Sequence, residues 1–172
     1  MFDPQLFFST LLTLFVILDP PGLLPVFLGL SRGMSAEARK ASARNAAVVA
    51  FGIISVFAVF GRFILDYLHI TIEALQVSGG LLLLLVAMQL LTGAGENETV
   101  ETNTNIAIVP LGIPLLAGPG SIVAMMLAVE QARGDLGGYL TVGLALVGAM
   151  LSVWLFLRFA GAIRRVLRES GT

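Results

Sequence analysis

The residues best suited to chemistry lie in two short motifs of proline and glycine. Each motif has four residues and interrupts a long apolar stretch: Asp19, Pro20, Pro21 and Gly22 in the first, and Gly118, Pro119, Gly120 and Ser121 in the second. Proline removes a backbone donor and clashes with the preceding turn, whereas glycine permits unusual dihedral angles. Both motifs therefore predict a helix break, near 19–22 and 117–120, whose freed backbone groups could bind a small polar solute.

The two motifs are in register with each other. Pro21-Gly22 and Pro119-Gly120 are separated by 98 positions (119 minus 21), each in the middle of an apolar span. Discontinuous helices at matching positions of two halves indicate a transporter binding site. Proline kinks with a packing role are the alternative interpretation.

Asp19 is the charged residue of the first motif. A carboxylate near the bilayer centre costs about 2.5–3.5 kcal/mol on insertion scales, so it is expected to have a function. Asp followed by Pro is also a good N-cap for the next half-helix, and the two roles are compatible. The second motif has Ala117 at the equivalent position, so one half alone carries the charge.

The second motif has no acidic residue. The amides that begin its half-helix, together with the Ser121 hydroxyl, suit an anionic group, because a helix N-terminus carries positive partial charge. One negative group facing one positive dipole end forms a cradle for a zwitterion. This is the hypothesis that the two motifs support.

The elements that position these motifs are membrane helices. Hydrophobic residues make up 57% of the 172 residues and charged residues 12%, with a mean hydropathy of +0.95. A soluble domain carries about a quarter charged residues, so the bilayer is the solvent that suits this chain. About 20 apolar residues cross a bilayer. Five stretches of the single domain 1–172 meet this length: 5–30, 45–66, 73–92, 106–129 and 136–158.

The order of the spans predicts an inverted repeat. The two motifs lie in the first and fourth spans, so the second motif enters the membrane from the opposite side. The fold class is therefore all-α, with five membrane helices, two of them broken. Residues 5–92 form the first three-helix repeat, and 106–172 form a second repeat that lacks its sixth helix.

The positive charges predict the orientation. Eight of the ten Lys and Arg residues fall on one side: Arg32, Arg39, Lys40, Arg44, Arg158, Arg164, Arg165 and Arg168. The positive-inside rule makes this side cytoplasmic, with the N-terminus outside. The loops 31–44 and 93–105 are then cytoplasmic as well.

Several classes of function are excluded by composition. The net charge of −1 argues against nucleic-acid binding. Cysteine is absent, so thiolate metal sites are excluded, and no cofactor is expected. An enzyme is not expected either, because the single His69 precludes His-Glu-x-x-His and Asp66 lies at the membrane edge rather than deep beside Asp19.

Three stretches resemble the MarC family of bacterial and archaeal inner-membrane proteins. They are Leu18 to Phe27 with Asp-Pro-Pro-Gly, Gln76 to Leu85 with Ser-Gly-Gly, and Pro110 to Ile122 with Pro-Leu-Gly-Ile-Pro-Leu-Leu-Ala-Gly-Pro-Gly-Ser-Ile. The resemblance covers nearly the whole chain. It implies a six-helix protein of the inner membrane, and some members are described as transporters of small neutral amino acids. The chain departs from the family in lacking a sixth helix.

The first expectation for function is secondary transport of a small neutral solute, such as an amino acid, by alternating access around the breaks. Asp19 would then contact an ammonium group or carry a coupling proton. The alternative is a membrane assembly or accessory protein that needs a partner helix. The partners expected are the lipid bilayer and the solute, and the pattern also allows a homo-oligomer.

Overall fold

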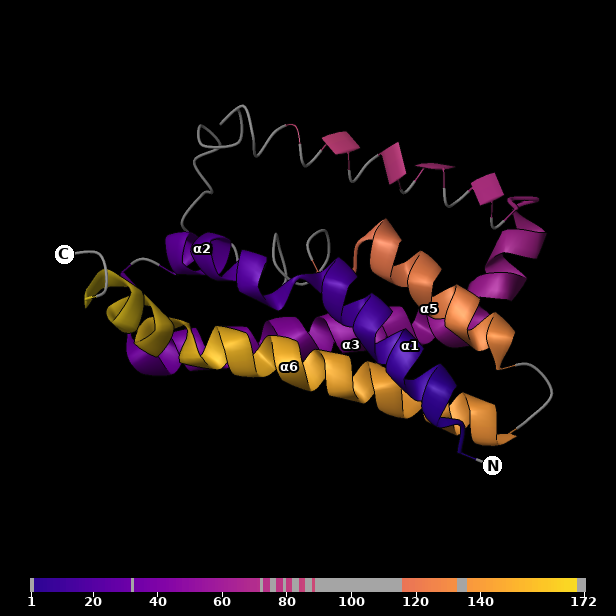
Figure 1. Cartoon of the computed structure of the whole chain (residues 1–172). Helices are drawn as coiled ribbons and strands as arrows, with labels where there is room; N and C mark the ends of the chain where they lie inside the picture. The colour runs from indigo at the N-terminus through magenta and orange to yellow at the C-terminus, as the bar shows by residue number, and fades with distance from the viewer. Residues whose placement is uncertain are drawn as a thin grey trace.

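The fold is a bundle of helices (Figure 1). The computed structural model describes residues 2–31, 33–71, 116–132 and 136–169, together with isolated residues between 73 and 88; for Arg62 and 162–169 it describes the backbone alone. Every element in these ranges is a helix. The helices are α1 (Pro4–Leu18), α2 (Pro20–Leu30), α3 (Ala36–Tyr67), α5 (Pro119–Gln131) and α6 (Leu136–Glu169).

Three stretches of the described chain are long and apolar enough to cross a membrane. They are Pro4–Leu30, Ala36–Gly61 and Leu136–Gly161, with mean hydropathies between 1.9 and 2.2. This agrees with the predicted all-helical membrane protein and with three of the five predicted spans. Most of the predicted span 73–92 and the first part of the span 106–129 lie outside the described residues.

Helix α6 packs against all the other described helices, α1, α2, α3 and α5. Fully buried alanines occur on both α3 and α6, among them Ala46 and Ala50 on α3 and Ala145 and Ala149 on α6. Small residues let the helix backbones approach closely, and dispersion contacts then hold the helices together where the hydrophobic effect is weak.

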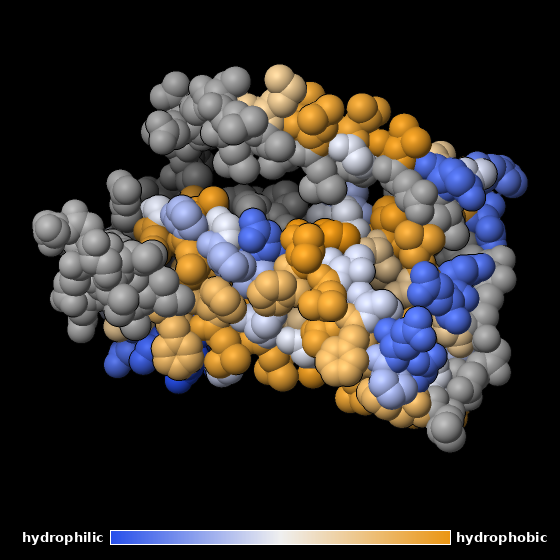
Figure 2. All heavy atoms as spheres, viewed as in Figure 1, coloured by the Kyte–Doolittle hydropathy of each residue, from blue (hydrophilic) through white to orange (hydrophobic). Residues whose placement is uncertain are grey.

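Large apolar side chains cover the outside of the bundle. Val16, Val59 and Phe63 are each more than 70% exposed, and Leu140 is 62% exposed. Figure 2 shows apolar residues over much of the visible face, with polar residues toward the ends. Water would penalise such a surface, whereas lipid chains solvate it at no cost.

Two helices extend beyond the predicted spans. The span predicted at 45–66 belongs to α3, which starts at Ala36, where Ser35 accepts a hydrogen bond from the Ala38 N–H. The span predicted at 136–158 belongs to α6, which continues to Glu169. Hydropathy detects only the apolar part of a helix, whereas backbone hydrogen bonding continues through the charged turns that leave the bilayer.

The half-helices α2 and α5 run toward opposite ends of the bundle (Figure 1). The N-terminus lies at the end where α6 begins, since the Asp3 N–H donates to the Thr141 hydroxyl over 3.3 Å. Helix α5 runs toward this end, and α2 runs away from it. The opposite directions agree with two breaks entered from opposite sides, although the repeat relation itself depends on spans that lie largely outside the described residues.

Candidate functional site

The first helix break consists of one residue. Asp19 has φ 42° and ψ 64°, the left-handed conformation, between the end of α1 at Leu18 and the start of α2 at Pro20. The break predicted over 19–22 is therefore shorter than expected. Proline is favourable at the first position of a helix, so the Pro-Pro pair starts α2 instead of prolonging the interruption.

All backbone donors of this break are accounted for. Pro20 and Pro21 have no N–H group. The Gly22 N–H donates to the Asp19 Oδ1 over 3.1 Å, and the Leu23 N–H donates to the Asp19 carbonyl over 3.0 Å. The Asp19 N–H donates back to the Phe15 carbonyl, also over 3.0 Å. The start of α2 thus has no free amide with which to bind an anion.

The acceptors of the same break are in excess. The carbonyls of Val16 and Ile17 would accept from the residues four positions later, which are prolines. The Leu18 carbonyl would accept from Gly22, whose N–H is directed to the Asp19 carboxylate. The C-terminal end of α1 also carries negative partial charge. Carbonyls without helical donors, together with a carboxylate that accepts a single backbone N–H, favour a cation at this point.

Gly22 leaves the space that the cap requires. A Cβ built on Gly22 would overlap with the Asp19 Oδ2 and would lie 2.7 Å from its Cγ. Any other residue type would displace the carboxylate from the Gly22 N–H. The four residues Asp-Pro-Pro-Gly thus act together: the first caps α2, the next two have no N–H group, and the last leaves space for the capping carboxylate.

The second break lies before α5. Ala117 and Gly118 are non-helical, and α5 begins at Pro119. The predicted interruption over 117–120 is again shorter than expected, for the same reason at the proline. Gly118 is the N-cap, one position later than the alignment with Asp19 predicts, because Gly118 precedes the single proline and Asp19 precedes two.

Ser121 holds this second break together. Its side chain is 2% exposed, and its hydroxyl lies 2.8 Å from the Leu116 carbonyl and 2.9 Å from the Gly118 carbonyl. The hydroxyl proton is therefore directed to backbone carbonyls of the break. Binding of a solute by the Ser121 hydroxyl stays a prediction, and in this conformation its donor is in use.

Donors remain at the start of α5. The amides of Gly120 and Ser121 lie in the first turn, where a helix supplies no backbone acceptor. The N-cap Gly118 has no side chain, and no side-chain cap bond forms. The first turn of α5 is therefore rich in donors, whereas the end of α1 is rich in acceptors.

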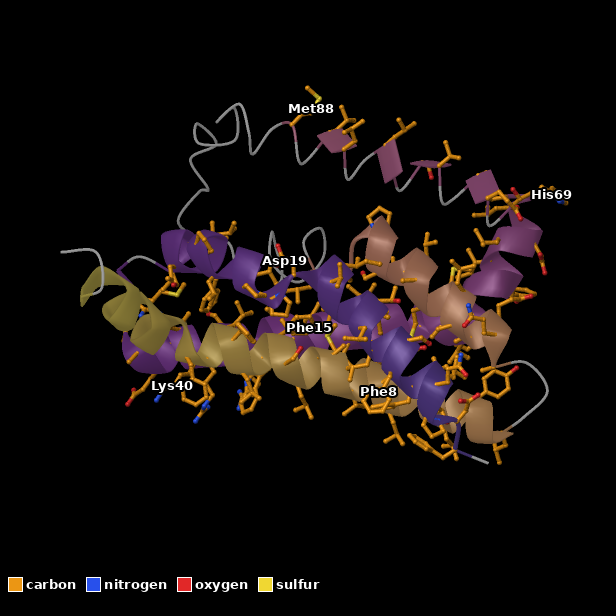
Figure 3. All side chains as sticks on the ribbon, viewed as in Figure 1. Phe8, Phe15, Asp19, Lys40, His69 and Met88 are labelled. Atoms are coloured by element: carbon orange, nitrogen blue, oxygen red, sulfur yellow. The ribbon has the colours of Figure 1, made fainter. Side chains whose placement is uncertain are left out.

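The two breaks border one core but differ in exposure. Leu18 and Leu23 beside the first break and Leu116 and Ala117 in the second belong to the same buried cluster, and α1 packs against α5. At the first break Pro20 is buried, and Figure 3 shows Asp19 at the junction of the half-helices. Three residues there are exposed: Asp19, Pro21 and Gly22.

In the second motif, Gly118 and Ser121 are buried, and Pro119 and Gly120 are half-buried. The core thus encloses the second break more fully than the first. From the third predicted span, Gln76 and Gly79 lie outside the described residues.

The backbone carbonyls of Val16, Ile17 and Leu18 were not among the site groups predicted from the sequence. A signal for them was present, because two consecutive prolines must leave the carbonyls four residues earlier without helical donors. The contact between Ser121 and Leu116 had no such signal. A serine in the first turn of a helix commonly bonds nearby backbone, but its partner depends on how the chain enters the helix.

Comparison of the sequence with known proteins identifies a family and several relatives. A family profile described as "MarC family integral membrane protein" matches residues 4–172. A UPF0056 membrane protein of Archaeoglobus fulgidus is 36% identical over 172 residues, which cover 96% of this chain and 80% of the relative. A UPF0056 membrane protein of Methanocaldococcus jannaschii is 34% identical, with coverage of 94% and 82%. The UPF0056 membrane protein YvbG of Bacillus subtilis is 32% identical, with 92% and 79%. No solved structure matches the chain significantly.

Proposed function

Because the chain belongs to the MarC family of integral membrane proteins, we propose that it is a secondary transporter of small neutral solutes such as amino acids. The proposal rests on one observation above all, the opposite hydrogen-bonding character of the two helix breaks. The first offers the carbonyls at the end of α1 and the Asp19 carboxylate, with no free amide. The second offers the amides of Gly120 and Ser121, with no capping side chain.

A zwitterion fits this pair of breaks. Its ammonium group needs acceptors and negative charge, which Asp19 and the carbonyls of Val16 to Leu18 provide. Its carboxylate needs donors and positive potential, which the first turn of α5 provides. Both ends of the solute would then be paired, which matters because an unpaired charge is costly in a medium of low dielectric constant.

The same geometry supports alternating access. The first break depends on the left-handed dihedral angles of one residue, so a small rotation at Asp19 would reorient α2 relative to α1. Transporters with broken helices move one bundle against another around a site at the breaks. We further propose that the chain lies in the cytoplasmic membrane with its N-terminus outside, as the positive-inside rule predicts, and it could act as a homo-oligomer.

A second candidate function has its own supporting observation. Asp19, Pro21 and Gly22 are exposed, although they lie beside a buried core. An exposed break in hydrocarbon requires cover by protein or a water-filled cavity. A membrane assembly protein whose first break is covered by a partner helix would explain the exposure without transport.

Transport by the purified protein in liposomes separates the two candidates. We expect uptake or exchange of at least one labelled small neutral amino acid from a panel that also contains acidic and basic amino acids. Protein-free liposomes give the background. Absence of uptake and exchange across the whole panel would favour the assembly function and contradict our proposal.

Asp19→Asn tests the role of the charge. Asparagine caps a helix about as well as aspartate and tolerates the left-handed conformation, so the break and the thermal stability should be retained. We expect transport to be abolished or uncoupled, because the amide cannot hold an ammonium group by charge or take up a proton. Transport at the parental level with the same pH dependence would restrict Asp19 to capping.

Asp3→Asn is the matched control for this variant. Asp3 is also an N-cap followed by proline, and it accepts from the Gln5 and Leu6 amides over 2.9 and 3.1 Å. It lies at the start of α1 instead of at a break. We therefore expect transport to be unchanged in Asp3→Asn.

A further inference from the structure

A groove on the outer face of the α3–α6 pair has the form of a lipid site. Its volume is about 340 Å³. The lining residues are almost all apolar, and they include Val48 and Phe51 from α3 and Val147, Leu151 and Trp154 from α6. Val48 is 63% exposed and Leu151 is 51% exposed, so the groove is open to the surroundings of the bundle.

The groove extends from the basic end of the bundle into the apolar belt. Arg44 lies at one end of its wall, and Phe51 follows seven residues later, a distance of about 10 Å along α3. On α6, which is antiparallel to α3, Trp154 lies beside Arg44 in the lining and Val147 lies about 10 Å farther in. This length accommodates a large part of one acyl chain.

Positive charge is concentrated where the groove meets the basic end. Lys40 lies one turn before Arg44 on the same face of α3, and Figure 3 shows Lys40 at this end of the bundle. The Arg158 guanidinium lies over the Trp154 ring, 5.2 Å from its centroid. The acidic residue in the first turn of α3 is Glu37, which lies three residues before Lys40 and does not line the groove. The charges of Lys40, Arg44 and Arg158 therefore outnumber that of Glu37 near the mouth.

We propose that this groove binds an anionic phospholipid, with one acyl chain along the apolar walls and the phosphate at Arg44. Basic pockets between membrane helices on the cytoplasmic side bind anionic headgroups. A zwitterionic lipid fits the walls equally well but brings its own cation to the basic mouth, so the charge selects the anionic class. This proposal is independent of the proposed transport activity.

Trp154 is the single tryptophan of the chain and reports directly on this groove. The full-length protein is reconstituted in phosphatidylcholine vesicles in which a fixed fraction of lipid is replaced. The replacement is either phosphatidylglycerol or phosphatidylcholine, and both are brominated near the headgroup end of their acyl chains, at the depth of Trp154. Bromine quenches tryptophan fluorescence on close contact, so the two quenching curves compare the affinities of the two lipid classes at one site.

We expect brominated phosphatidylglycerol to bind about fivefold more strongly for each basic side chain that contacts its phosphate. Arg44→Gln should reduce this preference about fivefold while leaving the quenching by phosphatidylcholine unchanged. Arg44 is exposed, so its replacement leaves the core intact. Equal quenching by both lipids in the parent, or an unchanged preference in Arg44→Gln, would overturn the proposal.

A steric variant tests the acyl-chain half of the proposal. Val147→Phe fills the inner end of the groove and should reduce the quenching by both lipids, since an acyl chain that cannot occupy the inner end is displaced from the groove and from Trp154. Leu144→Phe is the control, because Leu144 is 54% exposed on the same helix but does not line the groove. Equal effects of both variants would contradict the proposal. Absence of quenching in the parent would do the same, because a second copy or another helix would then occupy the groove.

Discussion

Asp-Pro-Pro-Gly interrupts a membrane helix with one residue out of helical conformation. Asp19 interrupts the helix by its left-handed conformation, which asparagine and aspartate tolerate better than most residues. Pro20 and Pro21 have no N–H groups to satisfy. Gly22 has no side chain, which leaves room for the Asp19 carboxylate to accept the Gly22 N–H. In hydrocarbon, where an unpaired amide costs several kcal/mol, each of these choices lowers the cost of the break.

Gly22→Ala is expected to destabilise the protein. The new Cβ would overlap with the Asp19 carboxylate, so the cap would be lost at a cost of about 1 kcal/mol or more. The midpoint of thermal unfolding in detergent should fall. Gly29→Ala on the same helix is the control, because nothing lies within 4 Å of its added Cβ and alanine favours a helix over glycine. Equal midpoints for the two variants would contradict the assigned role of Gly22.

The two half-helices differ in how their ends are satisfied. The start of α2 is capped by the Asp19 carboxylate. At α5, the Ser121 hydroxyl donates to the Leu116 carbonyl, and the first-turn amides have no capping side chain. The excess acceptors of the first element and the excess donors of the second both follow from this difference. Equal caps on both elements would leave no polarity between the breaks and no preferred orientation for a zwitterion.

Ser121→Ala should loosen the entry to α5. The Leu116 carbonyl would lose its 2.8 Å bond in a buried setting, which costs about 1–3 kcal/mol. The expected result is a lower midpoint of thermal unfolding. Ser152→Ala is the control, since the Ser152 hydroxyl bonds to the Ala149 carbonyl inside a regular helix, where a backbone N–H already serves that carbonyl. A Ser121→Ala protein as stable as Ser152→Ala would argue against the contact.

The bundle as a whole has two chemically distinct ends. The N-terminus and the start of α6 lie together at one end, joined by the Asp3–Thr141 hydrogen bond. The start of α3, with Lys40, lies at the other end (Figure 3). Helix α3 has 32 residues, and at 1.5 Å per residue it spans about 48 Å, enough to place its two ends on opposite sides of a bilayer.

Single cysteines test the orientation at this scale, because the natural chain contains none. Ala36→Cys, at the basic start of α3, should react with an impermeant thiol reagent only after the cells are permeabilised. Leu68→Cys, just beyond the other end of α3 and 54% exposed, should react in intact cells. The reverse pattern would invert the proposed orientation.

The sequence by itself determined that the chain is a helical membrane protein, that it belongs with the MarC family and that two proline–glycine motifs interrupt its helices. The first and third conclusions depend on hydropathy and the missing N–H of proline, which are local properties of the residues. The family follows instead from the resemblance of three motif stretches. The predicted spans 45–66 and 136–158 are shorter than the helices α3 and α6 to which they belong, because polar turns extend a helix without an apolar signal.

The Asp19 cap predicted from the sequence is confirmed, but only the tertiary structure decided how the second break is satisfied and how exposed the first one is. Whether the Ser121 proton faces a solute or the Leu116 carbonyl depends on the path of the chain into α5. Whether Asp19 is enclosed or exposed depends on which helices pack beside it, and in the structure Asp19 is exposed. The first outcome is set by the backbone path between Leu116 and Ser121, and the second by packing between helices distant in sequence. A pattern of local propensities encodes neither.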